Sequence, residues 1–354
     1  MTHESRTTRA IRIERLGPPE TLAEREVPLP RPGPGEVHLR VEAAGVNFAD
    51  LMMRVGLYGT VPPRPFSPGF EVAGVVVETG PGVEGWAQGD PAVALLQFGG
   101  YARDVVVPAS QVFRRPASLS AAESAAVPVV FLTAWVCLFE AARARAGERT
   151  LVLGAGGGVG TAAVQLAVGD GLRVVGTAGT PEKRRFVTDE LGAEACFDSR
   201  GDWEPEVRAH FGPRGLDIAL DPVGGPATAA CRRLLSPLGR LVFYGMSQAL
   251  PGRRRSWLRA ALAWFRTPRF HPAQLAEPNQ GIFGVHLLHL GDKGQRVLGP
   301  ALESIFARVV EGDLRPVLDR TFPLDRDGAA AAHAYLHSRK NLGKVVLVAE
   351  ESGA

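Results

Sequence analysis

The feature that most constrains the fold is the run TLVLGAGGGVGTAAVQLA at residues 150–167. A short apolar run typical of a strand leads into five glycines within seven residues, and an apolar stretch typical of a buried helix follows. A tight turn alone does not need so many glycines, whereas backbone that must approach a ligand does. The run therefore predicts a strand, a glycine turn and a helix of the kind that binds a dinucleotide in a doubly wound parallel sheet.

The end of this run aligns with the dinucleotide fingerprint as Ala155-x-Gly157-x-x-Gly160. Gly157 would let the backbone approach the pyrophosphate, and Gly160 would allow the helix to pack closely on the strand. The helix N-terminus would attract the anion, with Gly158 and Val159 as further backbone contacts. A purely structural turn is the alternative interpretation, but the strand and the helix on either side favour a dinucleotide site.

The next predicted strand indicates which nicotinamide cofactor is favoured. It is followed by Ala178-Gly179-Thr180, so the carboxylate that an NAD site offers to the ribose is missing from the end of this strand. The following helix begins Pro181-Glu182-Lys183, which can bring a cation to a 2′-phosphate. We therefore predict NADPH as the cofactor, with Thr177 and Lys183 among its contacts. A solvated helix face is the alternative for the cations of this helix.

Length and composition limit the classes of function. The 354 residues suffice for two domains, and 45% hydrophobic with 22% charged residues is ordinary globular composition. The net charge of +3 depends on six arginines within 253–269, and no nucleic-acid-binding motif accompanies them, so nucleic acid is not expected as a partner. The three cysteines are far apart and lack a CxxC pair, which disfavours disulfides and a cysteine zinc site and fits a reducing compartment.

Neither a leader nor a membrane span is indicated. The N-terminus MTHESRTTRA lacks the apolar core of a signal peptide, so we expect a cytoplasmic protein. The longest nearly apolar run, Ser124 to Phe139, is too short for a bilayer and is interrupted by Pro128. We interpret this run as a buried helix between two domains.

Two patterns divide the chain. Up to about Val107, short β-rich runs alternate with Pro/Gly clusters, which predicts a β-barrel-like first domain. Apolar runs then alternate with helical stretches, which is the pattern of a parallel α/β sheet. After a helix predicted at 301–311, strand character returns at 321–323 and 344–348, so the tail should complete the first domain. The other predicted strands are 10–15, 37–44, 72–79, 101–107, 150–153, 173–177, 216–220, 241–244 and 282–287.

Five strings along the chain carry further information: VNFADLMMRVGLYG, SPGFEVAGVV, GAGGGVGTAAVQLA, GLDIALDPVGG and NLGKVVLV. Together they resemble the medium-chain dehydrogenase/reductase superfamily, in its zinc-free quinone oxidoreductase branch, over nearly the whole chain. Within that branch, 241–265 and 284–290 are similar to the vesicle amine transport protein homologues. The resemblance implies an α/β protein with a GroES-like β-barrel catalytic domain at 1–127, completed by 292–354, and a Rossmann doubly wound parallel-sheet domain at 128–291. It also implies a homodimer formed through the Rossmann sheet edges.

The same resemblance shows which metal sites to look for. Zinc-dependent relatives place a Cys in the segment that here reads Gly45-Val46-Asn47, and a His where this chain has Phe70, which cannot ligate zinc. Residues 95–101 lack the cysteines of the structural zinc lobe. His333 and His337 are spaced i and i+4 on a predicted helix, but no third ligand is near in the sequence. We therefore expect no metal.

Without a metal to polarise a carbonyl, the acceptor must carry its own activation, which points to quinones and α,β-unsaturated carbonyls. The resemblance implies Tyr58 as candidate proton donor and Asn47 as the residue that orients the nicotinamide ribose or the substrate carbonyl. The alternatives are aromatic packing for Tyr58 and a turn-stabilising role for Asn47. The other cofactor contacts that the motifs imply are Thr133, Val223, Gly224, Tyr244, Gly245, Phe283, Val285 and Arg339.

The segment from Arg253 to Phe270 combines six arginines with tryptophan, leucine and phenylalanine. This pattern is typical of a helix on an anionic membrane surface and also of a lid or dimer segment with a buried apolar stripe, and both interpretations stay open. The sequence as a whole predicts a zinc-independent, NADPH-dependent quinone or enone reductase. A 2-enoyl thioester reductase and a non-catalytic, membrane-associated nucleotide-binding protein are the competing interpretations.

Overall fold

A computed structural model describes residues 6–59, 61–250, 261 and 265–350. These residues divide into two compact units. The first unit contains the described residues up to Val129 and those from Gln295 onward, and the second contains those from Val130 to Gly294. Most of the basic segment at 253–270 therefore lies outside the described residues.

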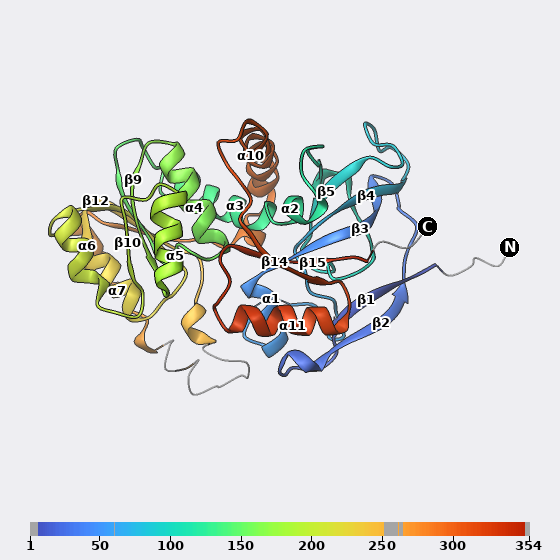
Figure 1. The fold of residues 1–354 in the computed structure, drawn as a ribbon, viewed down its shortest axis with the longest axis horizontal. Coiled ribbons are helices and arrows are strands. Elements are labelled where there is room, and N and C mark those ends of the chain that lie inside the picture. The colour runs from blue at the N-terminus through green and yellow to red at the C-terminus, as the bar shows by residue number, and fades with distance from the viewer. Residues whose placement is uncertain (1–5, 60, 251–260, 262–264, 351–354) are drawn as a thin grey trace. The chain divides into compact units, whose positions relative to one another are not determined.

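The first unit is built on strands (Figure 1). In its described residues a sheet runs in the order β14-β15-β3-β4-β5-β7, with β6 paired to β3, while β1 and β2 form a separate antiparallel pair. β15 pairs with the end of β3, Val345 opposite Val46, so the C-terminal part of the chain contributes to this sheet. The strands are β1 Thr7–Ile13, β2 Leu22–Pro28, β3 Glu36–Val46, β4 Glu71–Thr79, β5 Pro91–Leu95, β6 Asp104–Pro108, β7 Val112–Arg114, β14 Leu318–Pro323 and β15 Lys344–Val348.

Helix α1, Phe48–Val55, has its ends fixed by its own sequence. At its start, the carboxylate of Asp50 accepts a hydrogen bond of 2.8 Å from the backbone N–H of Asn47. At its end, Gly56 takes the left-handed conformation with φ 72°, which glycine adopts without strain. The other helices of this unit are α2 Ala121–Ala125, α11 Arg326–His337 and α10 Gly291–Glu311, which belongs to this unit from Gln295 onward.

The second unit contains a parallel sheet. Its described strands run in the order β10-β9-β8-β11-β12-β13, which is the doubly wound 3-2-1-4-5-6 order when they are numbered along the chain. This sheet confirms the predicted α/β class. The elements are β8 Arg149–Val152, α4 Gly158–Gly169, β9 Arg173–Ala178, α5 Pro181–Arg185, β10 Ala195–Asp198, α6 Trp203–Phe211, β11 Leu216–Asp221, α7 Pro226–Leu234, β12 Leu235–Phe243, α9 Pro272–Ala276 and β13 Gly281–Gly284.

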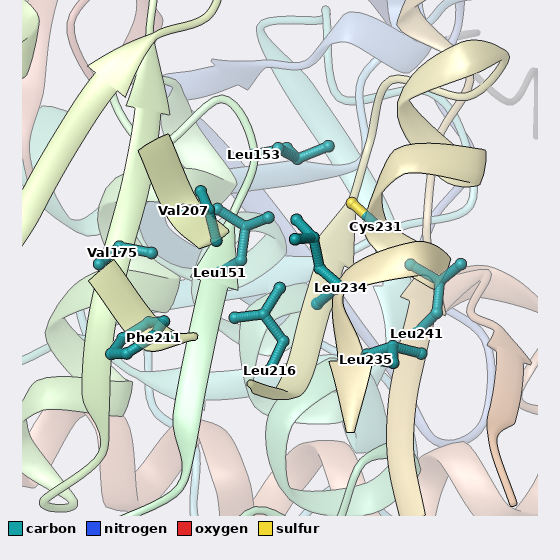
Figure 2. Close-up of a cluster of buried hydrophobic side chains, with 11 residues drawn as sticks. Leu151, Leu153, Val175, Val207, Phe211, Leu216, Cys231, Leu234, Leu235 and Leu241 are labelled. Carbon is teal, nitrogen blue, oxygen red and sulfur yellow. The ribbon is translucent and has the colours of Figure 1, made fainter. Parts of the chain in front are cut away.

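The core of the second unit fills the space between the sheet and helices α6 and α7 (Figure 2). Leu151 on β8 and Leu241 on β12 meet Leu234 from α7 and Phe211 from α6 in one buried cluster. Strands β8 and β11 lie in the middle of the sheet, which explains why most of their residues are apolar and buried. Burial of these side chains holds the strand ends, and the loops that follow them, in fixed register.

The long apolar run forms more than one helix. α2 ends at Ala125, α3 covers Pro128–Trp135, and a π-helical turn continues to Ala141. Pro128 stands at the first position of α3, where its missing N–H costs no intrahelical hydrogen bond, so it starts a helix here and does not interrupt one. Among the described residues, the stretch 121–141 is long and apolar enough to span a membrane, but 72% of its most apolar window is buried inside the protein, as in a core helix.

Several strands were not predicted from the sequence, and β2 shows the reason. It reads LAEREVP, with charged residues on both sides of the strand, and lies in a two-stranded pair that buries little of it. Alternation of apolar and polar residues reports a strand only when one face is buried.

Candidate functional site

The glycine turn of the second unit follows β8 and leads into α4, with Gly157 as the residue before the helix. Gly154 takes φ 66°, and a Cβ on Gly160 would lie 2.2 Å from the Gly154 carbonyl oxygen, so only glycine lets the helix approach this closely. Thr177 at the end of β9 is buried, and its Oγ1 accepts a hydrogen bond of 3.2 Å from the Gly154 N–H. This hydrogen bond to β9 therefore fixes the glycine turn that follows β8.

Most of the predicted cofactor contacts lie at one edge of the parallel sheet. Because its strands are parallel, the residues that follow them lie at their carboxyl ends, where ligands bind in open α/β sheets. β8 and β11 are neighbours, although they are the first and fourth strands of this sheet along the chain, so the strand order reverses next to the glycine turn. The predicted residues at this edge are Ala155, Gly157, Gly158, Val159, Gly160, Thr177, Lys183, Val223, Gly224, Tyr244, Gly245, Phe283 and Val285.

A buried acid that we did not predict as a site residue shapes this edge. Asp221 ends β11 and has 0% of its surface exposed. Its carboxylate accepts hydrogen bonds from the backbone of Val223 at 2.7 Å and Gly224 at 3.0 Å, and from Thr228 Oγ1 at 2.6 Å. Burial raises its pKa, and these hydrogen bonds oppose the rise. Through these hydrogen bonds, Asp221 fixes the backbone turn at Val223–Gly224.

Three polar side chains gather near the end of β9. The stem of Lys183 lies over the glycine turn, because a Cβ on Gly156 would lie 3.1 Å from Lys183 Cδ. Ser199 and Arg200 lie beside the backbone that follows β9, since a Cβ on Gly179 would lie 3.4 Å from both Ser199 Oγ and Arg200 Nε. Arg200 was missed in the sequence, because the strand before it, β10, was not predicted and its pairing with β9 is seen only in the structure.

The remaining predicted cofactor contacts lie elsewhere in the two units. Thr133 is a buried residue within α3, on the side of the chain that belongs to the second unit. Arg339 belongs to the first unit, follows α11, takes φ 54° and is exposed. Its role as a contact of the cofactor phosphate stays a prediction.

In the first unit, Asn47 occupies the position between β3 and α1 and is buried, with 8% of its surface exposed. Its Nδ2 donates to Glu71 Oε1 at 2.9 Å, and its Oδ1 accepts from Lys344 Nζ at 2.5 Å. The side chain of Asn47 is thereby fixed by two oppositely charged groups from β4 and β15. This arrangement fixes the orientation of the Asn47 side chain. A fixed side chain is compatible with the orienting role and with the turn-stabilising interpretation.

Glu71 and Lys344 form a buried ion pair. Their closest atoms are 2.5 Å apart, and their side chains are 0% and 3% exposed. Glu71 Oε2 also accepts a hydrogen bond of 2.7 Å from the backbone N–H of Val129. The pair therefore joins strands β4 and β15 to the last residue of the first unit's main segment.

Tyr58 follows α1 and is half-buried. Its ring centroid lies 6.0 Å from that of Phe70, at an interplanar angle of 48°. Burial, followed by the charge of Asp50, raises the pKa of Tyr58 to about 12. The phenol therefore keeps its proton throughout the physiological range, and it packs on an aromatic neighbour as the alternative interpretation supposed.

The donor set of the first unit does not fit a zinc ion. Phe70, at the position where zinc-dependent relatives carry a His, packs between the rings of Tyr58 and Phe98. His333 and His337 both lie within hydrogen-bond distance of the Arg54 guanidinium, a cation that opposes a metal ion there. Among the described residues, no group of three or more His, Cys, Asp or Glu side chains is placed to hold a metal.

Comparisons with known proteins agree with this geometry. A family model described as "Alcohol dehydrogenase GroES-like domain" matches residues 33–117, and one described as "Zinc-binding dehydrogenase" matches residues 191–347. The chain is 38% identical to the synaptic vesicle membrane protein VAT-1 homolog of Rattus norvegicus over 321 residues, which are 90% of this chain and 78% of that protein. It is 30% identical to the quinone oxidoreductase of the same species over 343 residues, which are 96% of this chain and 97% of that protein.

A solved structure of the quinone oxidoreductase from Thermus thermophilus, described together with its NADPH complex, is similar with a TM-score of 0.78 and 37% identity. The similarity covers 96% of this chain and 99% of that one. These matches confirm the resemblance drawn from the sequence and the GroES-like identity of the first unit. The chain belongs to the medium-chain dehydrogenase/reductase superfamily, in the group that includes the quinone oxidoreductases and the VAT-1 homologues.

Proposed function

We propose that this oxidoreductase is a zinc-independent, NADPH-dependent, cytoplasmic and homodimeric enzyme that reduces quinones or α,β-unsaturated carbonyls. The observation that carries the proposal is the polar end of β9. There, residues 178–180 offer no carboxylate side chain to a ribose, while Lys183 lies over the glycine turn and Ser199 and Arg200 lie beside Gly179. Cationic and hydroxyl donors suit a 2′-phosphate, which NADPH has and NADH lacks.

The residues present fit NADPH. The side chains of this protein would supply the proton that the reaction needs. When bound, the nicotinamide supplies a hydride to the conjugated carbon of the acceptor. Negative charge then collects on the acceptor oxygen, which needs a hydrogen-bond donor and finally a proton. Tyr58 is a phenol that stays protonated at neutral pH, so it can donate to this oxygen. Asn47, held by Glu71 and Lys344, would orient the ribose or the carbonyl.

Replacing Tyr58 by Phe tests the proton-donor role. We expect Tyr58→Phe to lower kcat for enone reduction by about 10- to 100-fold, at or below the lower end of the usual contribution of a general acid, because water can replace the phenol. NADPH affinity should barely change. Steady-state and single-turnover kinetics measure both, and Tyr335→Phe in α11 is the matched control, with unchanged kinetics expected. Unchanged turnover in Tyr58→Phe, with chemistry rate-limiting, would leave Tyr58 as a packing residue.

Zinc content provides a second prediction. Because Phe70 and the cysteine-free segment 95–101 remove the ligands of both family zinc sites, we expect no stoichiometric zinc in the isolated protein and no loss of activity with chelators. Elemental analysis before and after dialysis against a chelator measures this. One tightly bound zinc per chain that is lost together with activity would contradict the proposal.

The substrate class is decided by a screen of NADPH oxidation against quinones, enones and 2-enoyl thioesters. We expect quinones or enones to have the highest kcat/KM. Preference for a thioester would favour the enoyl reductase alternative. Binding of NADPH without turnover of any acceptor, together with binding to anionic vesicles, would favour the non-catalytic alternative, which the basic composition of 253–270 and the name of the VAT-1 homologue support.

A further inference from the structure

A chain of four buried side chains in the first unit joins Arg54 to Asp50. Arg54 Nε donates to His333 Nδ1 at 3.2 Å, and His333 Nε2 lies 3.2 Å from the Tyr101 hydroxyl. That hydroxyl donates to Asp50 Oδ2 at 3.3 Å. Each of the four residues has 0% of its surface exposed, so bulk water does not compete for these hydrogen bonds.

The chemistry of the end groups fixes the direction of the chain. A guanidinium only donates hydrogen bonds, and an ionised carboxylate, the form of Asp50 above its pKa, only accepts them. Because the single hydroxyl proton of Tyr101 goes to Asp50, its oxygen must accept from His333, which therefore carries its proton on Nε2. The other nitrogen, Nδ1, is then free to accept from Arg54. Burial, followed by the charge of Arg54, lowers the pKa of His333 well below its usual range, so the ring is neutral, as this arrangement requires.

The carboxylate at the end of the chain holds both sides of the candidate site. Asp50 Oδ2 accepts from the Asn47 N–H at 2.8 Å, and Asp50 Oδ1 accepts from the Gly69 N–H at 2.9 Å. Asn47 is the predicted orienting residue. Gly69 precedes Phe70, the ring on which Tyr58 packs. A rotation of the Asp50 carboxylate would therefore displace backbone on both sides at once.

We propose that Tyr101 and His333 are positioning residues that act on the site through the Asp50 carboxylate. Arg54 is their anchor, because it also donates to His337 Nε2 at 2.6 Å and to the carbonyl oxygen of Gly17. The inference rests on the proposed function only in taking the site around Asn47 as the place of reduction. The hydrogen-bond chain itself can be tested without turnover.

The charged and titratable groups around the chain come from several elements. Asp50 faces Lys344 on β15, Glu71 on β4 and the phenol of Tyr58, and His333 faces His337 on its own helix. Burial raises the pKa of Asp50 to about 7, while its backbone hydrogen bonds and Lys344 oppose the rise. Removal of any hydrogen-bond donor to the Asp50 carboxylate should therefore raise the pKa of Asp50 further.

Nuclear magnetic resonance of the full chain tests the direction of the hydrogen bonds. In ¹⁵N-labelled protein at pH 7, His333 should be neutral with its proton on Nε2, and loss of its signals in His333→Gln assigns them. In ¹³C-labelled protein, Tyr101→Phe should raise the pKa of Asp50 above that of the wild type. A His333 ring that is charged or protonated on Nδ1, or an unchanged Asp50 pKa in Tyr101→Phe, would overturn the chain as described.

Kinetics test the positioning role. Tyr101→Phe and His333→Leu should lower kcat by about 10- to 100-fold, the scale of a small misplacement of reacting groups, with little change in the KM for NADPH. His333→Gln should recover most of the loss, because its amide can accept from Arg54 and donate to Tyr101. A shifted Asp50 pKa with unchanged kcat would overturn the positioning role and leave only a structural one.

The same unit contains a matched control. His38, 2% exposed, has its Nδ1 2.8 Å from Arg6 Nη2 and its Nε2 3.0 Å from Asp104 Oδ1, so it also stands between an arginine and an aspartate. It lies near the start of β3, whereas Asn47 follows the end of that strand. His38→Leu should lower stability as His333→Leu does, while keeping kcat at temperatures where both are folded. Equal loss of kcat in the two variants would overturn the proposal.

Absence of any reductase activity in the wild type would instead contradict the proposed function, and the resonance measurements would still decide the hydrogen-bond chain.

Discussion

Lys344→Met is expected to destabilise the first unit by about 3–5 kcal/mol, because it leaves the buried carboxylate of Glu71 without its cation. The two side chains are 3% and 0% exposed, and their closest atoms are 2.5 Å apart. Lys344 also donates to Asn47 Oδ1, so the same change removes a hydrogen bond from a buried amide. Urea unfolding, followed by a probe in the first unit, measures the loss.

Two further variants separate the buried charge from the loss of packing. In Glu71→Gln/Lys344→Met, the charge of Glu71 is removed together with its cation, so this double variant should be more stable than Lys344→Met alone. Arg25→Met removes an exposed pair in the same unit, Arg25 with Glu14 at 2.8 Å, and should change the stability by no more than about 1 kcal/mol. If the double variant is the less stable one, the charge of Glu71 is not the cause of the loss.

Lys183→Ala/Arg200→Ala is expected to weaken NADPH binding by about 100-fold while leaving NADH binding nearly unchanged. A hydrogen bond to a charged group contributes about 1.5–3 kcal/mol, and the lower value applies to side chains that water reaches, so each residue accounts for about tenfold. Lys183 is half-buried over the glycine turn and Arg200 is exposed beside Gly179. Titration of cofactor fluorescence gives both affinities.

Arg184→Ala is the matched control for the cofactor prediction. Arg184 lies next to Lys183 in α5, but its guanidinium pairs with Asp198 at 3.2 Å. Its loss should change the NADPH affinity much less than the loss of Lys183. Equal or tighter binding of NADH by the wild type would contradict the NADPH assignment. An unaffected Arg200→Ala would remove Arg200 from the set.

The middle strands of the parallel sheet and the glycine turn were predictable because their signals are local. Strands β8 and β11 lie in the middle of a parallel sheet, so burial on both faces leaves short, mostly apolar runs in the sequence. Gly160 is demanded by backbone only six residues away, and such short-range contacts leave a fixed spacing of glycines. The absence of a carboxylate after β9 and the presence of Phe70 are likewise properties of the sequence itself.

The partners of the site residues were decided by the tertiary structure. Asn47 meets Lys344 across 297 positions, and Arg54 meets His333 across 279, and no local pattern encodes such pairs. Arg200 reaches Gly179 only because β10 pairs with β9.

The sequence by itself determined the parallel sheet, the glycine turn and the presence of Phe70 where zinc-dependent relatives carry a His, because each depends on the identity or short spacing of residues. Only the tertiary structure decided that Asp50, Glu71 and Lys344 are buried together, and that Arg54 is tied to two histidines. The physical reason is that a buried polar group must find its partner wherever the fold brings one, and a strand pairing or a packed helix can bring it from any distance along the chain.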